Sequence, residues 1–420
     1  MKYDKDLIII GAGPAGLAAA LSSKENGCTN ILIIERSQYM GGILNQCIHN
    51  GFGLHTFHQE LTGPEYAARY EKSIQDQHIP ISLNTMVLSI AAHSVTYVNQ
   101  TEGLVTLTCH AIILAMGCRE RPRGALNIPG YRPSGIYPAG TAQQLMNIEG
   151  KSVGKRIVIL GSGDIGLIMA RRLTLEGSKV LAVAEIMPYS GGLKRNIVQC
   201  LDDFHIPLYL SHTITQIEGK KRVEGVTLQK VGTDRKPIEG TTMHFDCDTL
   251  LLSVGLIPEN ELSIQAHVAL SPITHGPLVD DTLQTSVAGI FACGNVLHVH
   301  DLVDFVSEEA ALAGKMASDY VKNGEKQRNN IPLHCKNGVR YSVPQSIDPL
   351  EMEQEITIRF RVTDVFHNRS VALYANKTLL KKIKKKILAP GEMETITIKK
   401  TQDIAWNEVQ ALTIQTEETV

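Results

Sequence analysis

The chain has 420 residues and a net charge of −2, with 41 Lys and Arg residues against 43 Asp and Glu residues. This balance argues against a nucleic-acid-binding protein, in which a basic surplus usually covers a whole domain. Hydrophobic residues make up 43% of the chain and charged residues 20%. This composition excludes disorder as the main state, and the length suggests about three domains.

The eight cysteines are scattered, and no two of them lie closer than nine residues. The sequence therefore has no CxxC motif and no zinc-ribbon pattern, and it predicts no metal site. Scattered thiols are typical of a reducing compartment, so a cytoplasmic location is expected. Glycine and proline interrupt the apolar run Leu7–Leu21, and no window reaches the roughly 18 apolar residues of a spanning helix. We therefore expect no integral membrane segment.

The first predicted element is a buried strand at Leu7–Ile10 that runs into a glycine-rich turn. The segment Lys5–Leu21, KDLIIIGAGPAGLAAAL, aligns with Lys155–Arg171, KRIVILGSGDIGLIMAR, at an offset of 150 residues. Each copy predicts a parallel strand, a tight turn and a helix, followed by a second strand at 31–34 or 180–184. The matching glycines are Gly11, Gly13 and Gly16 in the first copy and Gly161, Gly163 and Gly166 in the second.

Both turns have the spacing GxGxxG, which is typical of dinucleotide-binding proteins. The first glycine permits the tight turn, the second lets a pyrophosphate approach the backbone, and the third allows close packing of helix and strand. Glu35 and Glu185 each lie 24 residues after the first glycine of their copy. From this position a carboxylate can accept hydrogen bonds from an adenosine ribose. Because no arginine directly follows Glu185, NAD is favoured over NADP at the second turn.

Two such turns in one chain resemble the two-dinucleotide-binding-domain flavoproteins, a family that includes the thioredoxin and glutathione reductases. The resemblance covers residues 1 to about 320, and it extends to the segments Ala111–Gly117, Asp248–Asn260 and Thr285–Asn295. It implies an α/β fold of two Rossmann-like domains, with the NAD domain inserted into the FAD domain. The implied boundaries are 1–122 and 261–325 for the FAD domain and 123–260 for the NAD domain.

The resemblance also implies where the cofactors bind, with FAD at the first turn and NAD at the second. A helix formed by the segment after Asn295 would direct its N-terminal N–H groups at the flavin. The family usually has an aspartate at this position, so Asn295 loses a charge-assisted hydrogen bond to the cofactor. The implied FAD residues are Gly11, Gly13, Pro14, Ala15, Gly16, Glu35, Arg36, Gly42, Gly117, Gly294 and Asn295, with Val87 on the adenine side; the implied NAD residues are Gly161, Gly163, Asp164, Ile165, Gly166, Glu185 and Gly255.

The redox cysteine pair of the best-known family members is absent from the corresponding segments. Only Cys47 follows the glycine pair at 41–42, and residues 135–147 contain no cysteine. A disulfide reductase is therefore not expected. The segments 41–53 and 289–304 most resemble flavoprotein subunits of opine oxidase and hydrogen cyanide synthase, and flavoproteins associated with glycerol-3-phosphate dehydrogenases. This branch implies electron transfer with partner subunits.

The favoured function is an FAD-dependent oxidoreductase that exchanges hydride with NAD(H) and passes electrons to or from a partner subunit or a small substrate. Two alternatives stay open. Cys47 could cycle through sulfenic acid, as in NADH oxidases and peroxidases, although a packing role is the simpler interpretation. Alternatively, the protein is a flavoprotein scaffold with a vestigial NAD site. Four histidines are candidates for a general acid or base: His49, His55, His298 and His300.

Residues 326–420 predict a small β domain of the sandwich type. Apolar and polar residues alternate in Ile356–Val362, as in half-buried strands. Residues 321–420 have a net charge of +4, and they include the lysine-rich run 381–386. A solvated edge strand explains this run, and docking of an acidic partner subunit is the functional alternative.

Overall fold

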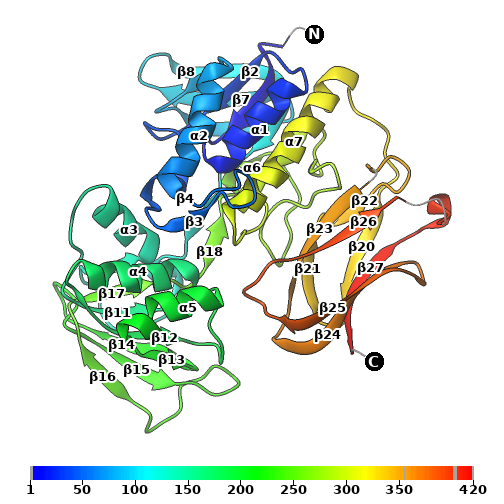
Figure 1. The fold of residues 1–420 in the computed structure, drawn as a ribbon. Coiled ribbons are helices and arrows are strands. Elements are labelled where there is room, and N and C mark those ends of the chain that lie inside the picture. Colours follow the sequence, from blue (N-terminus) through cyan, green and yellow to red (C-terminus); the bar gives the residue numbers. More distant parts are fainter. Residues whose placement is uncertain (1–2, 354, 401–403, 419–420) are drawn as a thin grey trace. The chain divides into compact units, whose positions relative to one another are not determined.

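The chain folds into two compact units, which Figure 1 shows in a computed structural model. The first unit comprises Met1–Cys118 and Pro258–Val420, and the second comprises Arg119–Ile257. Each unit contains a mainly parallel sheet of Rossmann type, and the first unit also carries the C-terminal β domain. The α/β fold with one nucleotide-binding domain inserted into another is therefore confirmed. The structure describes residues 3–353, 355–400 and 404–418.

The first unit is built on a seven-stranded sheet. Its strands are β1 (Lys5–Ile10), β2 (Ile31–Ile34), β5 (Ile81–Ser82), β6 (Met86–Ala91), β7 (Ser94–Asn99), β8 (Gly103–Leu114) and β19 (Ile290–Ala292). Their order is β5-β2-β1-β8-β7-β6, with β19 also paired to β8. Ile8 of β1 lies opposite Leu32 of β2 and Ile112 of β8, and all three strands run parallel. The continuous apolar runs in the sequence suit such strands, which are buried on both faces.

Strand β8 joins two kinds of pairing. Its first half pairs antiparallel with β7, where Val95 lies opposite Leu107. Its second half pairs parallel with β1 and β19, so that Leu114 lies opposite both Ile10 and Ala292. The carboxyl ends of three parallel strands therefore meet at one edge of the sheet. In α/β proteins this is the edge at which ligands bind.

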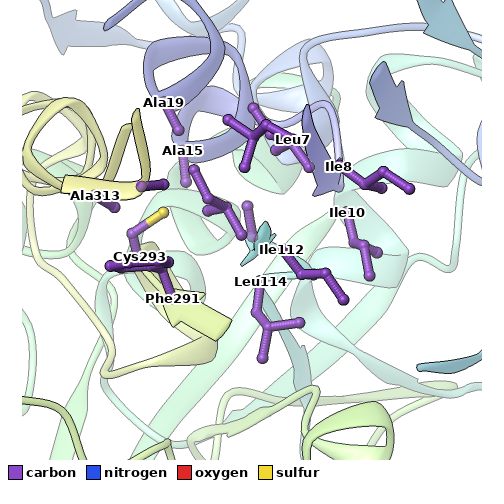
Figure 2. Packing of buried hydrophobic residues seen from close by; sticks show 14 of the residues in the cluster. Leu7, Ile8, Ile10, Ala15, Ala19, Ile112, Leu114, Phe291, Cys293 and Ala313 are labelled. Atoms are coloured by element: carbon purple, nitrogen blue, oxygen red, sulfur yellow. The ribbon is translucent and has the colours of Figure 1, made fainter. Parts of the chain in front are cut away.

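Two helices with small side chains pack against each other beside this sheet. They are α1 (Pro14–Glu25) and α7 (Val303–Asn323). A Cβ added at Gly314 of α7 would lie 2.2 Å from the carbonyl oxygen of Ala19 in α1. Figure 2 shows Ala15 and Ala19 near Ala313 in the buried cluster. The smaller elements of this unit are η1 (Gly42–Gln46), β3 (Asn50–Phe52), β4 (Leu61–Thr62), α2 (Gly63–Asp76), α6 (Glu261–Gln265) and η4 (Gly294–Val296).

Helix α7 begins later than the sequence predicts. The segment directly after Asn295 does not continue as a helix, and Leu302 is extended, with φ −125° and ψ 133°. In this segment the backbone N–H of His300 is bonded to the side chain of Asn295, and the rings of His298 and His300 contact the carboxylate of Glu309. Side-chain hydrogen bonds thus stabilise a non-helical segment before α7.

The second unit has a five-stranded parallel sheet in the order β10-β17-β11-β12-β13. Its strands are β10 (Ile136–Pro138), β11 (Arg156–Leu160), β12 (Lys179–Glu185), β13 (Leu208–Leu210) and β17 (Thr249–Leu252). Three helices accompany it, α3 (Ala139–Asn147), α4 (Asp164–Leu175) and α5 (Lys194–Cys200). A separate antiparallel sheet consists of β14 (His212–Glu218), β15 (Gly225–Lys230) and β16 (Met243–Asp246). Two short helices are η2 (Arg123–Ala125) and η3 (Asp202–Phe204).

The chain passes between the units through two short strands, β9 (Cys118–Glu120) and β18 (Leu256–Pro258). These strands pair with each other. The two connections thus form one ribbon, which is how a domain can be inserted into another without breaking either sheet.

The C-terminal domain has two sheets around a core of its own. One sheet has the order β22-β20-β27-β24-β25 and the other has the order β21-β23-β26. Strand β25 lies at the edge of the larger sheet, as predicted for the lysine-rich run. The elements are β20 (Ile331–Lys336), β21 (Val339–Val343), β22 (Ser346–Ile347), β23 (Glu355–Val362), β24 (Phe366–Ala375), β25 (Thr378–Leu388), β26 (Glu394–Lys399), η5 (Trp406–Glu408) and β27 (Leu412–Glu418).

Packing at Gly314 gives a test of the fold. A Gly314→Val substitution should lower the free energy of unfolding by about 1–3 kcal/mol or more, because the new side chain is forced into the backbone of α1. Thermal unfolding followed by circular dichroism measures the change. Gly124→Ala is the matched control, since its Cβ would meet no atom of the described residues within 4 Å. Equal effects of the two substitutions would contradict the close helix contact.

Candidate functional site

The first glycine turn, between β1 and α1, has the shape that a pyrophosphate requires. Gly11 has φ +107°, and a Cβ there would lie 2.4 Å from the carbonyl oxygen of Ala115. A Cβ at Gly13 would meet nothing in the described part of the chain within 4 Å, so space is open above this residue. A Cβ at Gly16 would lie 1.8 Å from the carbonyl oxygen of Gly11. The three glycines thus provide a tight turn, open space and close helix packing, and the binding of a ligand in that space stays a prediction.

The start of α1 is suited to an anion. Its N-cap, Gly13, has no side-chain hydrogen bond among the described residues, and Pro14 occupies the first helical position. The first turn of the helix contains no acidic residue. The free N–H groups and the positive end of the helix dipole therefore fit the pyrophosphate of a dinucleotide.

A buried carboxylate closes this turn from the end of β2. Glu35 is 8% exposed. Its Oε2 accepts the N–H of Ala12 at 2.7 Å, and its Oε1 accepts the N–H of Ser37 at 2.8 Å. Each carboxylate oxygen has two acceptor positions, so Glu35 keeps further acceptors for the hydroxyls of a ribose.

The second glycine turn repeats this arrangement at an offset of 150 residues. Gly161 has φ +97°. Glu185 accepts the N–H of Ser162 at 2.9 Å and the N–H of Met187 at 3.0 Å. Ser162 and Met187 are the counterparts of Ala12 and Ser37 in the first copy. The duplication seen in the sequence is therefore also a duplication of hydrogen bonds.

The second turn differs from the first where its helix begins. Asp164 stands where the first copy has Pro14, so a carboxylate lies in the first turn of α4. Its Oδ1 accepts the N–H of Leu193 at 2.8 Å and the side-chain amide of Asn196 at 2.6 Å. The helix start thus already carries a negative group, which competes with a phosphate for the positive end of the dipole.

A second group of predicted residues lies at the strand edge of the first unit. Gly117 and Gly294 both have φ +72°, a conformation that favours glycine. Asn295 accepts the N–H of His300 at 3.0 Å with its Oδ1. Its amide also contacts the sulfur of Cys118 at 3.6 Å. Because β8 and β19 are adjacent, the segments that carry Gly117, Gly294 and Asn295 are brought together with the first glycine turn.

The other residues that the sequence predicts to contact a cofactor lie in different local environments. Gly42 lies against the first turn, since its Cβ would be 3.0 Å from the Cα of Gly13. Arg36 is exposed directly after Glu35. Val87 is a buried core residue of β6, 7% exposed. Gly255 has φ +100° at the end of the second unit. Ala15 is buried in α1, and Ile165 is half-buried in α4.

Asp304 is a supporting residue that the sequence analysis missed. Its carboxylate lies in the first turn of α7 and is 4% exposed. It accepts the backbone N–H groups of Gly53 at 3.1 Å, His55 at 3.2 Å and Thr56 at 2.8 Å. The bonds fix the loop that follows η1 and β3 to the start of α7. Of the histidine candidates, His55 is thus held by its backbone, and its ring stacks on Phe305.

Glu309 is a second missed residue, and it connects two other histidine candidates. Its carboxylate contacts Nε2 of His298 at 2.8 Å and Nε2 of His300 at 3.1 Å, and it also accepts the N–H of Gly294 at 2.8 Å. Burial lowers the pKa of His298 to about 4. The two histidines and their hydrogen bonds hold the pKa of Glu309 well below its usual value, against the effect of burial. This cluster is connected to the Gly294–Asn295 turn through the hydrogen bond between Glu309 and the N–H of Gly294.

Cys47 does not have the environment of a reactive thiol. Burial raises its pKa to about 12, whereas reactive cysteines have a lowered pKa. Its sulfur lies 3.3 Å from the carbonyl oxygen of Ile43, and its own carbonyl accepts the N–H of Gly63. All eight cysteines fall within the described ranges, and none of them forms a disulfide there.

The comparisons with known proteins identify the family. Residues 5–317 match the pyridine nucleotide-disulphide oxidoreductase family. The chain belongs to this family. It is therefore an FAD-dependent oxidoreductase that uses a pyridine nucleotide. Among the helices that the structure describes, none combines the length and apolarity needed to cross a bilayer.

Similar proteins include both reductases and subunits of larger enzymes. The hydrogen cyanide synthase subunit HcnB of Pseudomonas protegens is 25% identical, over 74% of this chain and 69% of its own length. The thioredoxin reductase of Treponema pallidum is 26% identical, over 76% of this chain and 98% of its own. An opine oxidase subunit from Agrobacterium tumefaciens is 24% identical, over 69% of this chain and 61% of its own.

Solved structures share the fold over the same region. Thioredoxin reductase from T. acidophilum matches with a TM-score of 0.62 and 23% identity, covering 76% of this chain and all of that one. A persulfide reductase from A. fulgidus matches with a TM-score of 0.57 and 18% identity, covering 88% and 67%. These matches support the two-domain fold that the sequence predicts.

The setting of Cys47 can be tested by alkylation. With a pKa of about 12 instead of about 9, the thiolate fraction of Cys47 near pH 8 should be about a thousandfold below that of an ordinary thiol. Iodoacetamide labelling of the folded protein, read at peptide level by mass spectrometry, should therefore leave Cys47 unmodified until the chain is denatured. The denatured sample is the control. Rapid labelling in the folded state would contradict this setting.

Proposed function

We propose that the protein exchanges hydride between NAD(H) and a tightly held FAD, and that it passes the electrons to or from a partner subunit or a small substrate without a redox disulfide. The single observation that carries this proposal is the duplicated turn, in which a strand-end carboxylate is bonded to the glycine loop at both Glu35 and Glu185. FAD, when bound, supplies a ring that accepts or donates hydride.

The first turn is the better site for FAD. Its unit also contains Gly117, Gly294 and Asn295, so the residues expected on the flavin side share one rigid sheet edge with the phosphate-binding turn. The start of α1 is free of acidic groups. Helix α7 has no side-chain cap at Leu302 among the described residues, and the carboxylate in its first turn, Asp304, is bonded to the backbone of the loop at 53–56. These features favour tight retention.

The second turn is suited to a nucleotide that exchanges. The carboxylate of Asp164 shares the start of α4 with the expected phosphate position. Repulsion between these anions weakens binding at this turn relative to the first, where Pro14 carries no charge. A hydride donor that must leave after each turnover needs such modest affinity, whereas a resident cofactor does not.

Glu185 favours NAD over NADP at this turn. Its carboxylate is 9% exposed and is fixed by the N–H groups of Ser162 and Met187. It keeps acceptor positions for ribose hydroxyls and would repel a 2′-phosphate. The residue after it is Ile186, so no arginine directly follows to neutralise such a phosphate.

The cysteine chemistry argues for electron transfer without a disulfide. Cys47 is the only cysteine in the stretch 41–53, and burial keeps its thiol protonated. Two of the similar proteins are subunits of hydrogen cyanide synthase and opine oxidase. The positive C-terminal domain, with a lysine-rich edge strand at 381–386, offers a docking surface to an acidic partner. A partner subunit is therefore the favoured second reactant.

Anaerobic titration tests the hydride exchange. Addition of one equivalent of NADH to the FAD-loaded chain should bleach the visible flavin band, since the nucleotide is oxidised as the flavin is reduced. Cys47→Ser should bleach to the same extent, because no thiol takes part. Flavin that binds stoichiometrically but is never reduced by NADH or NADPH would contradict the proposed hydride exchange. It would favour a vestigial nucleotide site. Loss of reduction in Cys47→Ser alone would favour thiol chemistry.

Substitution of Glu185 tests the nucleotide preference. Glu185→Gln should raise the KM for NADH about 10- to 100-fold, because a charge-assisted hydrogen bond is lost and an amide donor meets a backbone N–H. The ratio of kcat/KM for NADH over NADPH should fall, since the repulsion of a 2′-phosphate is removed. Glu176→Gln, which changes an exposed carboxylate of the same unit, is the control. An unchanged ratio in Glu185→Gln would show that specificity resides elsewhere.

A further inference from the structure

Three chemically capable side chains converge in the first unit, in a place that hydride exchange does not use. His298 and His300 follow the Gly294–Asn295 turn, and Glu309 lies in the second turn of α7. Their side chains are 0%, 1% and 1% exposed. Three ionisable or metal-ligating groups with so little solvent contact require a specific reason, because burial of a carboxylate without compensation is costly.

The donor atoms are close enough to share one ion. One ligand atom from each of the three side chains lies within 4.8 Å of the other two. The carboxylate oxygens of Glu309 lie 2.8 Å from Nε2 of His298 and 3.1 Å from Nε2 of His300. Ligand atoms at about 2.0–2.2 Å from a common ion are separated from one another by about 3 Å when they are neighbours in its coordination sphere. An ion therefore needs only a small expansion of the cluster.

Hydrogen bonding within the cluster does not satisfy it. The Nδ1 atoms of His298 and His300 are both buried and have no hydrogen-bond partner in the described part of the chain. Buried polar atoms are nearly always satisfied, so these two Nδ1 atoms need partners of their own, such as water molecules, beyond the contacts that the Nε2 atoms make with Glu309. The two rings are also in contact, with centroids 4.2 Å apart.

The nearby cations are used elsewhere. Among the described residues, no lysine or arginine forms an ion pair with Glu309. Arg359 of β23 pairs with Glu308 at 3.3 Å, and Arg361 pairs with Asp301. Tyr341 of β21 faces the ring of His298, and Cys293 is buried at the end of β19. In the described part of the chain, the charged or chargeable partners in direct contact with the buried carboxylate are thus the two imidazoles, which can also ligate a cation.

We propose that His298, His300 and Glu309 bind one divalent transition-metal ion of the Zn²⁺ or Fe²⁺ class. Two imidazoles and one carboxylate suit these ions, whereas Mg²⁺ and Ca²⁺ prefer oxygen ligands alone. The site is new relative to the expectation of no metal, which rested on the spacing of cysteines and did not consider a His-x-His pair with a distant glutamate.

The metal would stabilise the conformation of the Gly294–Asn295 turn. Glu309 accepts the N–H of Gly294, and the carbonyl oxygen of Gly294 accepts the N–H of His298 at 3.2 Å. The backbone N–H of His300 is bonded to Asn295. All three ligands are thus attached to the turn that is expected to contact FAD, and the ion would fix them relative to one another. The assignment does not depend on hydride transfer or on the nucleotide preference.

Metal analysis of the full chain tests the site. Protein is stripped with a chelator, dialysed against Zn²⁺ or, without oxygen, against Fe²⁺, and freed of excess ion before elemental analysis. The expected result is one tightly bound ion per chain for at least one metal, with a higher Tm than the stripped protein. Less than a tenth of an equivalent with both metals would overturn the proposal and leave a hydrogen-bonded cluster only.

Matched variants locate the ion. Glu309→Gln should lose the metal and the metal-dependent rise in Tm, whereas Glu308→Gln, the exposed neighbour, should keep both. His300→Gln provides a second test if Glu309→Gln does not fold, as judged by circular dichroism. Full metal retention in a folded Glu309→Gln or His300→Gln protein would overturn the assignment. FAD content and NADH reduction are measured on the same samples, so failure of the proposed function is seen separately from failure of metal binding.

Discussion

The structure depends on one interaction that occurs twice, a hydrogen bond from a glycine turn to a carboxylate at the end of the neighbouring strand. Glu35 and Glu185 are almost fully buried, and each ties the backbone of its turn to the residue two positions beyond itself. Burial of an ionised carboxylate is tolerable only because backbone N–H groups compensate it. Each carboxylate keeps further acceptor positions beyond these bonds.

The two copies share this constraint but differ in charge. The first begins its helix with Pro14 and the second with Asp164, so similar turns differ in the charge at the helix start. The difference separates a helix start that contains no acidic residue in its first turn from one that already carries a carboxylate.

What the sequence predicts well is local. The strands at 7–10, 31–34 and 157–160 lie where continuous apolar runs place them, because such runs are buried on both faces of a parallel sheet. The two glycine turns could be predicted equally well, because the GxGxxG spacing is sufficient to indicate a tight turn between a strand and a helix. Asp304 was missed because its partners are remote: it binds a loop about 250 residues earlier in the chain. No periodicity reports a contact of that kind. Glu309 was missed although His298 and His300 lie only 11 and 9 residues before it, because their spacing does not show that both rings turn to one carboxylate.

The C-terminal domain is fastened to the loop between η4 and α7. Asp301 of that loop pairs with Arg361 of β23 and accepts the N–H of Met393 at 2.5 Å, while Arg361 also donates to the carbonyl oxygen of Val299 at 3.1 Å. The C-terminal domain is therefore joined to the rest of the first unit by these hydrogen bonds as well as by the linker before β20. These bonds hold the domain against the segment that follows the Gly294–Asn295 turn.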